Sequence, residues 1–297
     1  MDLWIVFTLF AAFAQTLRFA LQKALGGAGL SPGGATFARF LFAAPLASLA
    51  AAVLYLHMGV AVPRPDAAFV GFVLLGGVAQ IIATELTVRL MALRSFATGI
   101  AFTKTETLQV ALASALVLGE AVTPGAGFAM AVGWAGLICL SFPKGRSVAF
   151  EPRPVLYGLA AGALFAIAAI CYRGATLALE PAPFFLRALL ALAAATLLQS
   201  VVMALWLALR EPGQIGRVLL GWRRTAPVGI TGLLGSLGWF AAFALQNAAY
   251  VRALGQIEVI FTLMMSAFYF RERLGLREVA GLLLLSASVV LLVLLAR

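Results

Sequence analysis

The chain has 297 residues, of which 63% are hydrophobic and only 11% are charged, and its mean hydropathy is +1.05. This composition excludes a soluble globular domain, in which about 25% of the residues are charged. The formal net charge of +10 does not indicate nucleic-acid binding. The basic residues lie mainly in short segments between apolar runs, as they do on the cytoplasmic side of membrane proteins.

Apolar runs of about 17–25 residues recur along the whole chain, and each is long enough to cross a bilayer as a helix. Backbone groups in lipid must be hydrogen-bonded internally, and the long uninterrupted runs favour helices over the alternating strands of a barrel. We therefore predict an all-α membrane protein with ten transmembrane helices. The runs cover residues 3–22, 33–56, 67–91, 95–118, 124–142, 154–179, 182–208, 227–246, 249–270 and 275–296.

The first three runs carry polar residues at helical spacing. Thr8, Gln15, Arg18 and Gln22 fall near one stripe of the first helix, so they can face inward together. The second run places Arg39 about two turns into its helix.

The third run places Gln80, Thr84 and Thr87 on one face. Glu85 has Arg89 four residues later, which predicts a local ion pair.

The fourth run begins a pattern that recurs in the ninth. Glu106 lies inside an apolar helix and Glu120 follows 14 residues later, while Glu258 and Glu272 repeat this arrangement 152 residues further on. An ionisable side chain costs roughly 2.5–3.5 kcal/mol at the centre of a bilayer, so two matched glutamates require a polar environment. Gln109 shares the face of Glu106. We expect both glutamates to face a polar cavity.

The second half of the chain repeats the first. Arg173 corresponds to Arg18 and Arg187 to Arg39, at separations of 155 and 148 residues. A connector rich in proline and basic residues marks the boundary between the halves. The predicted organisation is a first five-helix repeat over 1–143, a connector over 144–153 and a second five-helix repeat over 154–297. Five is an odd number, so the second repeat enters the membrane inverted, as in many secondary transporters.

The eighth run has a face of small residues formed by Gly229, Gly232, Gly235 and Gly238, which permits close helix approach. Its other face carries larger side chains suited to lining a cavity. The predicted cavity-lining residues are Gln15, Gln80, Thr84, Gln109, Trp239, Phe243 and Tyr250.

In these features the chain resembles the ten-helix EamA-type branch of the drug/metabolite transporter superfamily. Leu118-Gly119-Glu120 matches the repeat ending of that family, and Arg271-Glu272-Arg273-Leu274 matches it except for a glycine. Thr107 and Val259 stand where the family commonly has a proline after the glutamate. The resemblance implies a secondary exporter or importer of small metabolites, with a cavity built from helices one to four and six to nine.

The charged residues inside the spans suggest how a substrate would be held. Each half can build an Arg–Arg–Glu cluster beneath its own mouth, which would anchor an anionic group and act as a gate. Arginine suits this role because its planar fork binds carboxylate or phosphate bidentately. Permanent ion pairs that hold helices in register are the alternative. The substrate-binding or gating candidates are Arg18, Arg39, Glu106, Arg173, Arg187 and Glu258.

The function predicted from the sequence is secondary transport, with export favoured, of a small polar metabolite bearing a carboxylate or phosphate, such as an amino acid or organic acid. A passive facilitator or channel and a flippase for lipid-linked substrates are the alternatives, and proton coupling through Glu106 or Glu258 is open. A single histidine, His57, argues against an intramembrane enzyme and a histidine-rich metal site. No cofactor or metal is expected, and the protein is expected to be a monomer or weak dimer.

The distribution of basic residues predicts the orientation in a bacterial-type inner membrane. Thirteen Lys and Arg residues fall in loops of one side, and Arg64, Arg252 and Arg297 fall on the other. The positive-inside bias then places both termini outside the cytoplasm. Relatives are often drawn with both termini inside, so the two orientations stay open.

Overall fold

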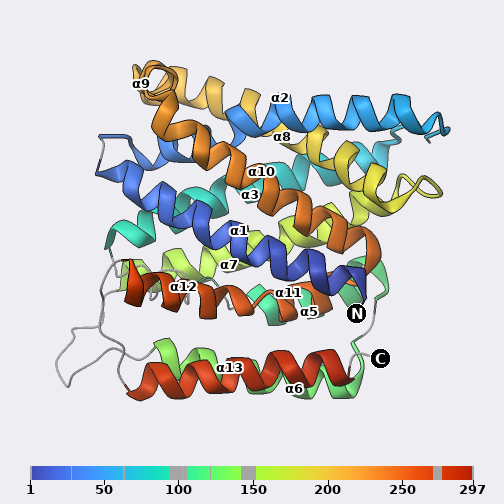
Figure 1. Cartoon of the computed structure of the whole chain (residues 1–297), viewed down its shortest axis with the longest axis vertical. Coiled ribbons are helices and arrows are strands. Elements are labelled where there is room, and N and C mark those ends of the chain that lie inside the picture. Colours follow the sequence, from blue (N-terminus) through green and yellow to red (C-terminus); the bar gives the residue numbers. More distant parts are fainter. Residues whose placement is uncertain are drawn as a thin grey trace.

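The computed structural model describes residues 2–27, 29–62, 64–93, 103, 106–120, 122–141, 152–269 and 276–295. In these ranges the chain forms only helices, which run side by side as a bundle (Figure 1). The helices are α1 (Leu3–Gly26), α2 (Pro32–Met58), α3 (Ala67–Leu93), α5 (Glu106–Leu118), α6 (Pro124–Ser141), α7 (Pro152–Leu177), α8 (Phe184–Arg210), α9 (Gln214–Leu220), α10 (Trp222–Leu245), α11 (Ala248–Leu254), α12 (Ile257–Phe268) and α13 (Leu276–Leu295).

Seven helical segments among the described residues are long and apolar enough to cross a membrane. They are α1, α2, α3, α8 and α10, most of α7, and the stretch 248–265 that combines α11 with most of α12. The chain is thus a multi-pass membrane protein, and its described residues form helices without strands, as predicted. The predicted spans 124–142 and 275–296 appear as the helices α6 and α13, and much of 95–118 lies outside the described residues. The count of ten spans stays a prediction.

The start of α2 is fixed by its sequence. Ser31 is the N-cap, and its hydroxyl accepts a hydrogen bond from the Gly34 nitrogen at 2.9 Å. Pro32 occupies the first helical position, where its missing N–H costs nothing. The helix ends at Gly59, whose φ of +60° is readily adopted only by glycine. This start positions Arg39, two turns further along, inside the bundle.

Glycines let α10 lie directly against α1 and α2. A Cβ added at Gly238 would lie 2.8 Å from the Ala11 Cβ, and one at Gly229 would lie 2.4 Å from the Phe42 Cβ. Both separations are too short for a real side chain, so only glycine permits this approach. Helix association in membranes depends on such packing because lipid offers no hydrophobic drive. The predicted small-residue face therefore lies in a helix interface.

The predicted run 249–270 is divided into two helices, with a break at Gly255 and Gln256. Gly255 leaves room for the ring of Trp239, because a Cβ at Gly255 would lie 2.6 Å from the Trp239 Cη2 atom. Asn247 starts α11 as N-cap, and its side chain accepts a hydrogen bond from the Ala249 nitrogen at 2.7 Å. Broken helices at membrane depth are tolerated where protein or a water-filled cavity surrounds them.

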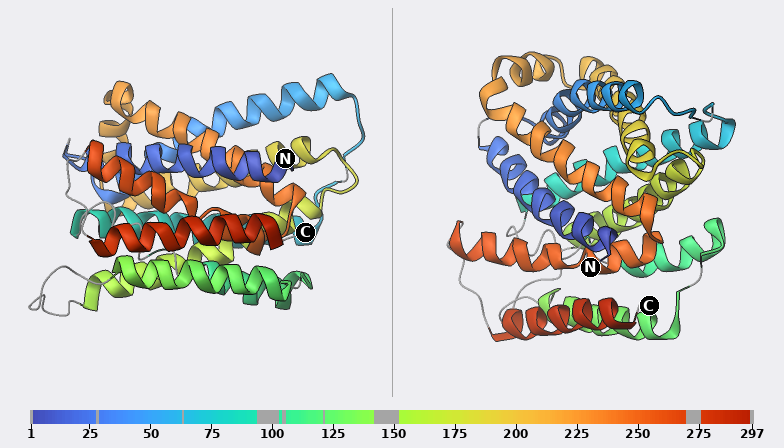
Figure 2. Two further views of the ribbon diagram at one scale, coloured as in Figure 1. Left: turned by 60° about the horizontal axis from the view of Figure 1, so that its bottom comes forward. Right: turned by 45° about the vertical axis from the view of Figure 1, so that its right-hand side comes forward.

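The first turn of α1 and the last turn of α13 lie at the same end of the bundle (Figure 2). The helices α6 and α13 pack against each other as a separate pair beside the other helices (Figure 1). The described polar residues that the sequence singles out lie in or next to the larger group of helices, α1 to α3, α5, α7, α8 and α10 to α12, whereas Glu272 lies outside the described residues.

Candidate functional site

A small cavity lies near the middle of the larger group of helices. Its volume for water-sized occupants is about 20 Å³, which is room for about one water molecule. Five aromatic side chains form much of its wall, and the polar part of the wall comes from two amides, one hydroxyl and one guanidinium. The aromatic residues are Phe165, Tyr172, Trp239, Phe240 and Phe243, and the polar ones are Gln15, Gln80, Ser236 and Arg252.

A chain of polar contacts along the cavity wall ends at Glu258. The indole nitrogen of Trp239 donates to the Gln15 Oε1 at 2.9 Å, and the Gln15 Nε2 donates to the Glu258 Oε2 at 2.8 Å. Glu258 is fully buried. A glutamate of the second half is therefore bound by a residue of the first half.

Glu106 is bound in the reverse way, by a residue of the second half. The Arg252 Nη2 donates to the Glu106 Oε2 at 2.9 Å, and both side chains are buried. The Arg252 guanidinium also lies 4.8 Å from the ring centre of Trp239, within cation–π range. The expectation of an Arg–Arg–Glu cluster in each half is therefore wrong. Each glutamate instead binds a residue of the other half of the chain.

Arg252 is the functional candidate that the sequence reasoning missed. Its assignment to a loop is wrong, because Arg252 lies in α11 and is 7% exposed. The repeat pattern could not identify it, since the position 152 residues earlier is the apolar Ile100. Its place inside the apolar run 249–270 was the available signal. An arginine inside such a run is a functional-site candidate by default.

Arg18 and Arg39 form the first arginine pair, and both are buried, at 1% and 3% exposure. Their side chains meet on Gly232, where an added Cβ would lie 2.9 Å from the Arg39 Cγ and 3.3 Å from the Arg18 Cδ. Arg39 donates to the Thr84 hydroxyl at 2.8 Å and to the Ser236 hydroxyl at 3.2 Å. Ser236 lines the central cavity, so Arg39 lies one hydrogen bond from it.

The first arginine pair has no carboxylate partner among the described residues. Arg18 donates to the side-chain oxygen of Gln22, and its Nη2 atom is buried without a hydrogen-bond acceptor. Glu258 attracts Arg18 at longer range but forms no ion pair with it. Two cations thus lie side by side in the protein interior, where their described contacts are with hydroxyl and amide groups and with the rings of Phe19 and Phe40. Removing such charges from water costs several kcal/mol per ion.

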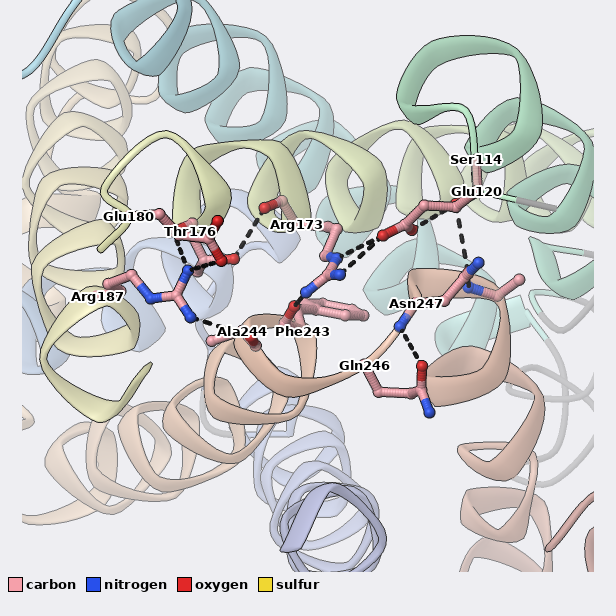
Figure 3. Close-up of polar contacts among 11 residues, drawn as sticks. Ser114, Glu120, Arg173, Thr176, Glu180, Arg187, Phe243, Ala244, Gln246 and Asn247 are labelled. Atoms are coloured by element: carbon pink, nitrogen blue, oxygen red, sulfur yellow. Dashed lines mark hydrogen bonds and ion pairs between the residues drawn. The ribbon is translucent and has the colours of Figure 1, made fainter. Parts of the chain in front are cut away.

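Arg173 and Arg187 form the second arginine pair, and each has a carboxylate (Figure 3). Arg173 donates through Nε and Nη2 to the Glu120 Oε1, at 2.9 and 2.8 Å. Arg187 donates to the Glu180 Oε1 at 2.6 Å.

Both arginines of this second pair also bind the end of α10. Arg173 donates to the carbonyl of Phe243, and Arg187 lies 3.4 Å from that of Ala244. Cations are favourable at a helix C-terminus, where carbonyls have no partner within the helix. The second pair therefore ties α7, α8 and the segment after α5 to the end of α10.

The other predicted residues have mixed positions. Gln80, Trp239 and Phe243 line the cavity together with Gln15, and Thr84 lies behind the wall as a partner of Arg39. The Tyr250 hydroxyl instead accepts a hydrogen bond from the Thr123 nitrogen at 3.1 Å, at the start of α6. Gln109 is half-buried on α5 and is not among the described lining residues. Glu85 and Arg89 form the predicted ion pair.

The cysteines and the acidic residues form no metal site in the described part of the chain. Cys139 and Cys171 are free thiols. No three His, Cys, Asp or Glu side chains gather closely enough there to hold a metal ion. The chemistry available at the site is therefore that of arginine, carboxylate, amide and aromatic groups, which can bind and release a solute.

Comparison with known proteins supports a transporter. The model of the EamA-like transporter family matches residues 152–294. A solved crystal structure superposes over 96% of this chain and 98% of its own, with a TM-score of 0.67 and 18% sequence identity, which shows a shared fold. Among curated proteins, none matches this sequence. Residues 152–294, just under half of the chain, are thus similar to the EamA-like transporter family, in agreement with the sequence resemblance, and this similarity indicates a membrane transporter.

Proposed function

We propose that this protein is a secondary transporter that exports a small polar metabolite bearing a carboxylate or phosphate, such as an amino acid or organic acid. The substrate binds at the central cavity and is released by alternating access. The observation that carries this proposal is the first arginine pair, which is buried and has no carboxylate partner among the described residues.

An anionic substrate would supply the partner that this pair lacks. Arginine stays charged at any physiological pH, so the cost of burying Arg18 and Arg39 cannot be avoided by deprotonation. Two guanidinium groups side by side can together bind one carboxylate or phosphate through several hydrogen bonds. The unsatisfied Nη2 of Arg18 is one donor available for such a bond. We therefore assign substrate binding to Arg18 and Arg39.

The second arginine pair is proposed to act as a gate. Arg173 and Arg187 form ion pairs with Glu120 and Glu180 and donate hydrogen bonds to the carbonyls at the end of α10, and these contacts must break if that end of the cavity opens. The cavity holds about one water molecule, so a metabolite can enter only after the surrounding helices separate. Ion pairs that form when the cavity closes and break when it opens can act as such a gate.

The proposed architecture is the pair of inverted five-helix repeats, over 1–143 and 154–297. Helix packing supports it, because α1 packs on α10 and α3 packs on α7, and these two pairs exchange if each helix is replaced by its counterpart in the other half. The family match also begins at residue 152, close to the predicted start of the second repeat. The start of α1 and the end of α13 lie at the same end of the bundle, which agrees with the even number of spans that we propose (Figure 2).

Transport in reconstituted liposomes tests the proposal. A thermal-stability screen of the purified protein against amino acids, organic acids and phosphorylated metabolites would first identify a ligand, since a ligand that binds only the folded state raises stability. Flux of that ligand is then measured for wild type and for Arg18→Ala and Arg39→Ala. We expect both variants to lose flux. Undiminished flux in both would remove the first arginine pair from the mechanism.

The same liposomes distinguish active from passive transport and test coupling. Accumulation against a substrate gradient would exclude a passive facilitator. An imposed pH gradient that drives accumulation would support proton carriage by Glu106 or Glu258, whereas flux that ignores the gradient would count against it. A terminal reporter fusion would show whether the termini lie outside the cytoplasm of a bacterial inner membrane, as the charge distribution predicts.

A lateral groove favours flipping of lipid-linked substrates as the second candidate. An apolar groove of about 200 Å³ lies between α1 and α12, lined by side chains that include Phe13, Phe261 and Phe268. Thr16 also lines it, and the Thr16 hydroxyl lies 3.5 Å from the Glu258 carbonyl oxygen, close to the cavity. A lipid tail could remain in such a groove while a polar headgroup crosses. Flux of lipid-linked substrates but not of soluble anions would favour this function.

A further inference from the structure

The segment that joins α8 to α10 forms an elbow at one end of the bundle. We call residues 210–224 the basic elbow; it contains the short helix α9. In Figure 1 the long helices run across the picture, while α9 is seen nearly end-on. The helix α9 therefore lies across the ends of the spans, in the direction of the membrane surface.

The basic elbow presents a dense group of cations. Four arginines in these 15 residues are exposed, and the stretch contains a single acidic residue, Glu211. The Glu211 carboxylate is half-buried and accepts a hydrogen bond from the Ser31 hydroxyl, so it is turned toward α2. The elbow thus offers an excess of positive charge to its surroundings. The exposed arginines are Arg210, Arg217, Arg223 and Arg224.

Exposed apolar side chains lie among these cations. Leu220 is 88% exposed, Trp222 is 55% exposed and Leu219 is 51% exposed, whereas Val218 packs inside. Tryptophan favours the interface between lipid and water, and leucine beside it can enter the acyl region. A soluble acidic partner would leave these groups in water. A membrane surface matches both the cations and the apolar side chains.

We propose that the basic elbow binds the phosphate headgroups of anionic phospholipids in the leaflet that it faces. The apolar residues anchor the elbow at headgroup depth, and the arginines bind the phosphates. Arg223 and Arg224 are the best-placed members, because neither side chain donates a described hydrogen bond to protein. Arg217, in contrast, donates to the Gly29 carbonyl at 3.2 Å.

The elbow also holds the start of α2, which carries Arg39 to the substrate site. The Ser31 backbone nitrogen donates to the Gln214 Oε1 at 3.2 Å. A Cβ at Gly34 would lie 2.6 Å from the same oxygen, and one at Gly33 would lie 2.7 Å from the Trp206 ring. Lipid bound at the elbow therefore stabilises a segment that packs directly on α2. We expect anionic lipid to raise the stability of the whole protein.

Thermal unfolding of the protein in a neutral detergent tests the lipid site independently of any substrate. Dioleoyl phosphatidylglycerol is added in one series, dioleoyl phosphatidylcholine in a second and inorganic phosphate in a third. We expect phosphatidylglycerol to raise the Tm of the wild type by several degrees more than either of the other two. The double variant Arg223→Gln/Arg224→Gln should lose at least half of this difference, and high salt should reduce the difference in the wild type.

Matched variants make the result decisive. Arg64→Gln removes an exposed arginine between α2 and α3, at the opposite end of the bundle, and should keep the full lipid effect (Figure 1). Arg223→Lys/Arg224→Lys keeps the charge and should keep most of it. An equal lipid effect in the double glutamine variant and the wild type would overturn the proposal. So would equal stabilisation by phosphatidylcholine or by inorganic phosphate.

Discussion

The two arginine pairs, one in each half of the chain, have different surroundings. Arg18 and Arg39 are buried against Gly232 and contact hydroxyl and amide groups. Arg173 and Arg187 bind carboxylates and the carbonyls at the end of α10 (Figure 3). The second pair has carboxylate partners in the protein, and the first pair has none among the described residues.

We expect this difference to distinguish the arginines that bind substrate from the arginines that stabilise the fold. Breaking a satisfied ion pair leaves a stranded charge, so it costs folding stability. Removing a buried cation that has no carboxylate partner relieves a desolvation cost, so it should cost little stability and remove whatever ligand the cation binds. Stability and transport should therefore respond in opposite ways to substitutions in the two pairs.

The largest expected effect is on transport, in Arg39→Met. We expect the flux of the anionic substrate to fall about 10- to 100-fold, because hydrogen bonds to a charged group contribute about 1.5–3 kcal/mol. The Tm of the unliganded variant should equal or exceed that of the wild type. Flux in proteoliposomes and thermal unfolding measure the two quantities. A variant that unfolds much earlier than the wild type would mean that Arg39 is a structural residue.

The next effect is on stability, in Arg173→Met. Loss of its bonds to Glu120 and to the Phe243 carbonyl should lower the free energy of unfolding by about 1–3 kcal/mol. The Glu120 side chain is 17% exposed, so water would partly replace the lost partner. Thermal unfolding of Arg173→Met, Glu120→Gln and the double variant gives the coupling between them. Strict additivity would show that the ion pair contributes nothing.

A smaller effect is expected from Gly232→Ala, which keeps both arginines but crowds them. The new Cβ would press on the Arg39 and Arg18 stems and turn both guanidinium groups. We expect the affinity for the anionic substrate to fall about threefold to tenfold, which corresponds to roughly 1 kcal/mol. Gly216→Ala is the matched control, because no atom lies within 4 Å of the Cβ that it would add. Equal affinities in both alanine variants would contradict the proposed contact of the arginines with substrate.

The smallest effect is expected from Glu180→Gln, which removes the ion pair between Glu180 and Arg187. The Glu180 side chain is 57% exposed, so its bond to Arg187 competes with water. Exposed ion pairs contribute at most about 1 kcal/mol. Glu180→Gln should therefore change the Tm by only a degree or two and leave ligand affinity unchanged. A large loss of stability would place Glu180 in a less hydrated environment than its exposure indicates.

The sequence predicts the helical membrane fold and many of the buried polar residues, because length and hydropathy determine which segments can cross lipid. It also predicts the glycine face of α10 and the pair of Glu85 with Arg89, both of which depend on short-range spacing. The predictions that succeed are therefore local ones. They require no knowledge of which helices lie side by side.

The partners of the charged residues could not be predicted, because they depend on helix packing across the chain. Glu106 pairs with Arg252, 146 residues away, and Glu258 with Gln15, 243 residues away. Pairing each glutamate with arginines of its own half is reasonable from spacing alone, and it is wrong. The break in the ninth run, at Gly255 and Gln256, was not predicted either, and Gly255 there packs against the ring of Trp239 in the preceding helix.

The central claim is that Arg18 and Arg39 bind the negative charge of the substrate. The most direct measurement compares the binding of a carboxylate or phosphate ligand with the binding of its uncharged amide analogue. The quantity is the dissociation constant of the amide divided by that of the anionic ligand, for wild type, Arg39→Met and Arg187→Met. We predict a ratio of about 10 to 100 in the wild type, a similar ratio in Arg187→Met and a much smaller ratio in Arg39→Met, in which Arg18 alone remains. A ratio that Arg39→Met leaves unchanged would contradict the claim.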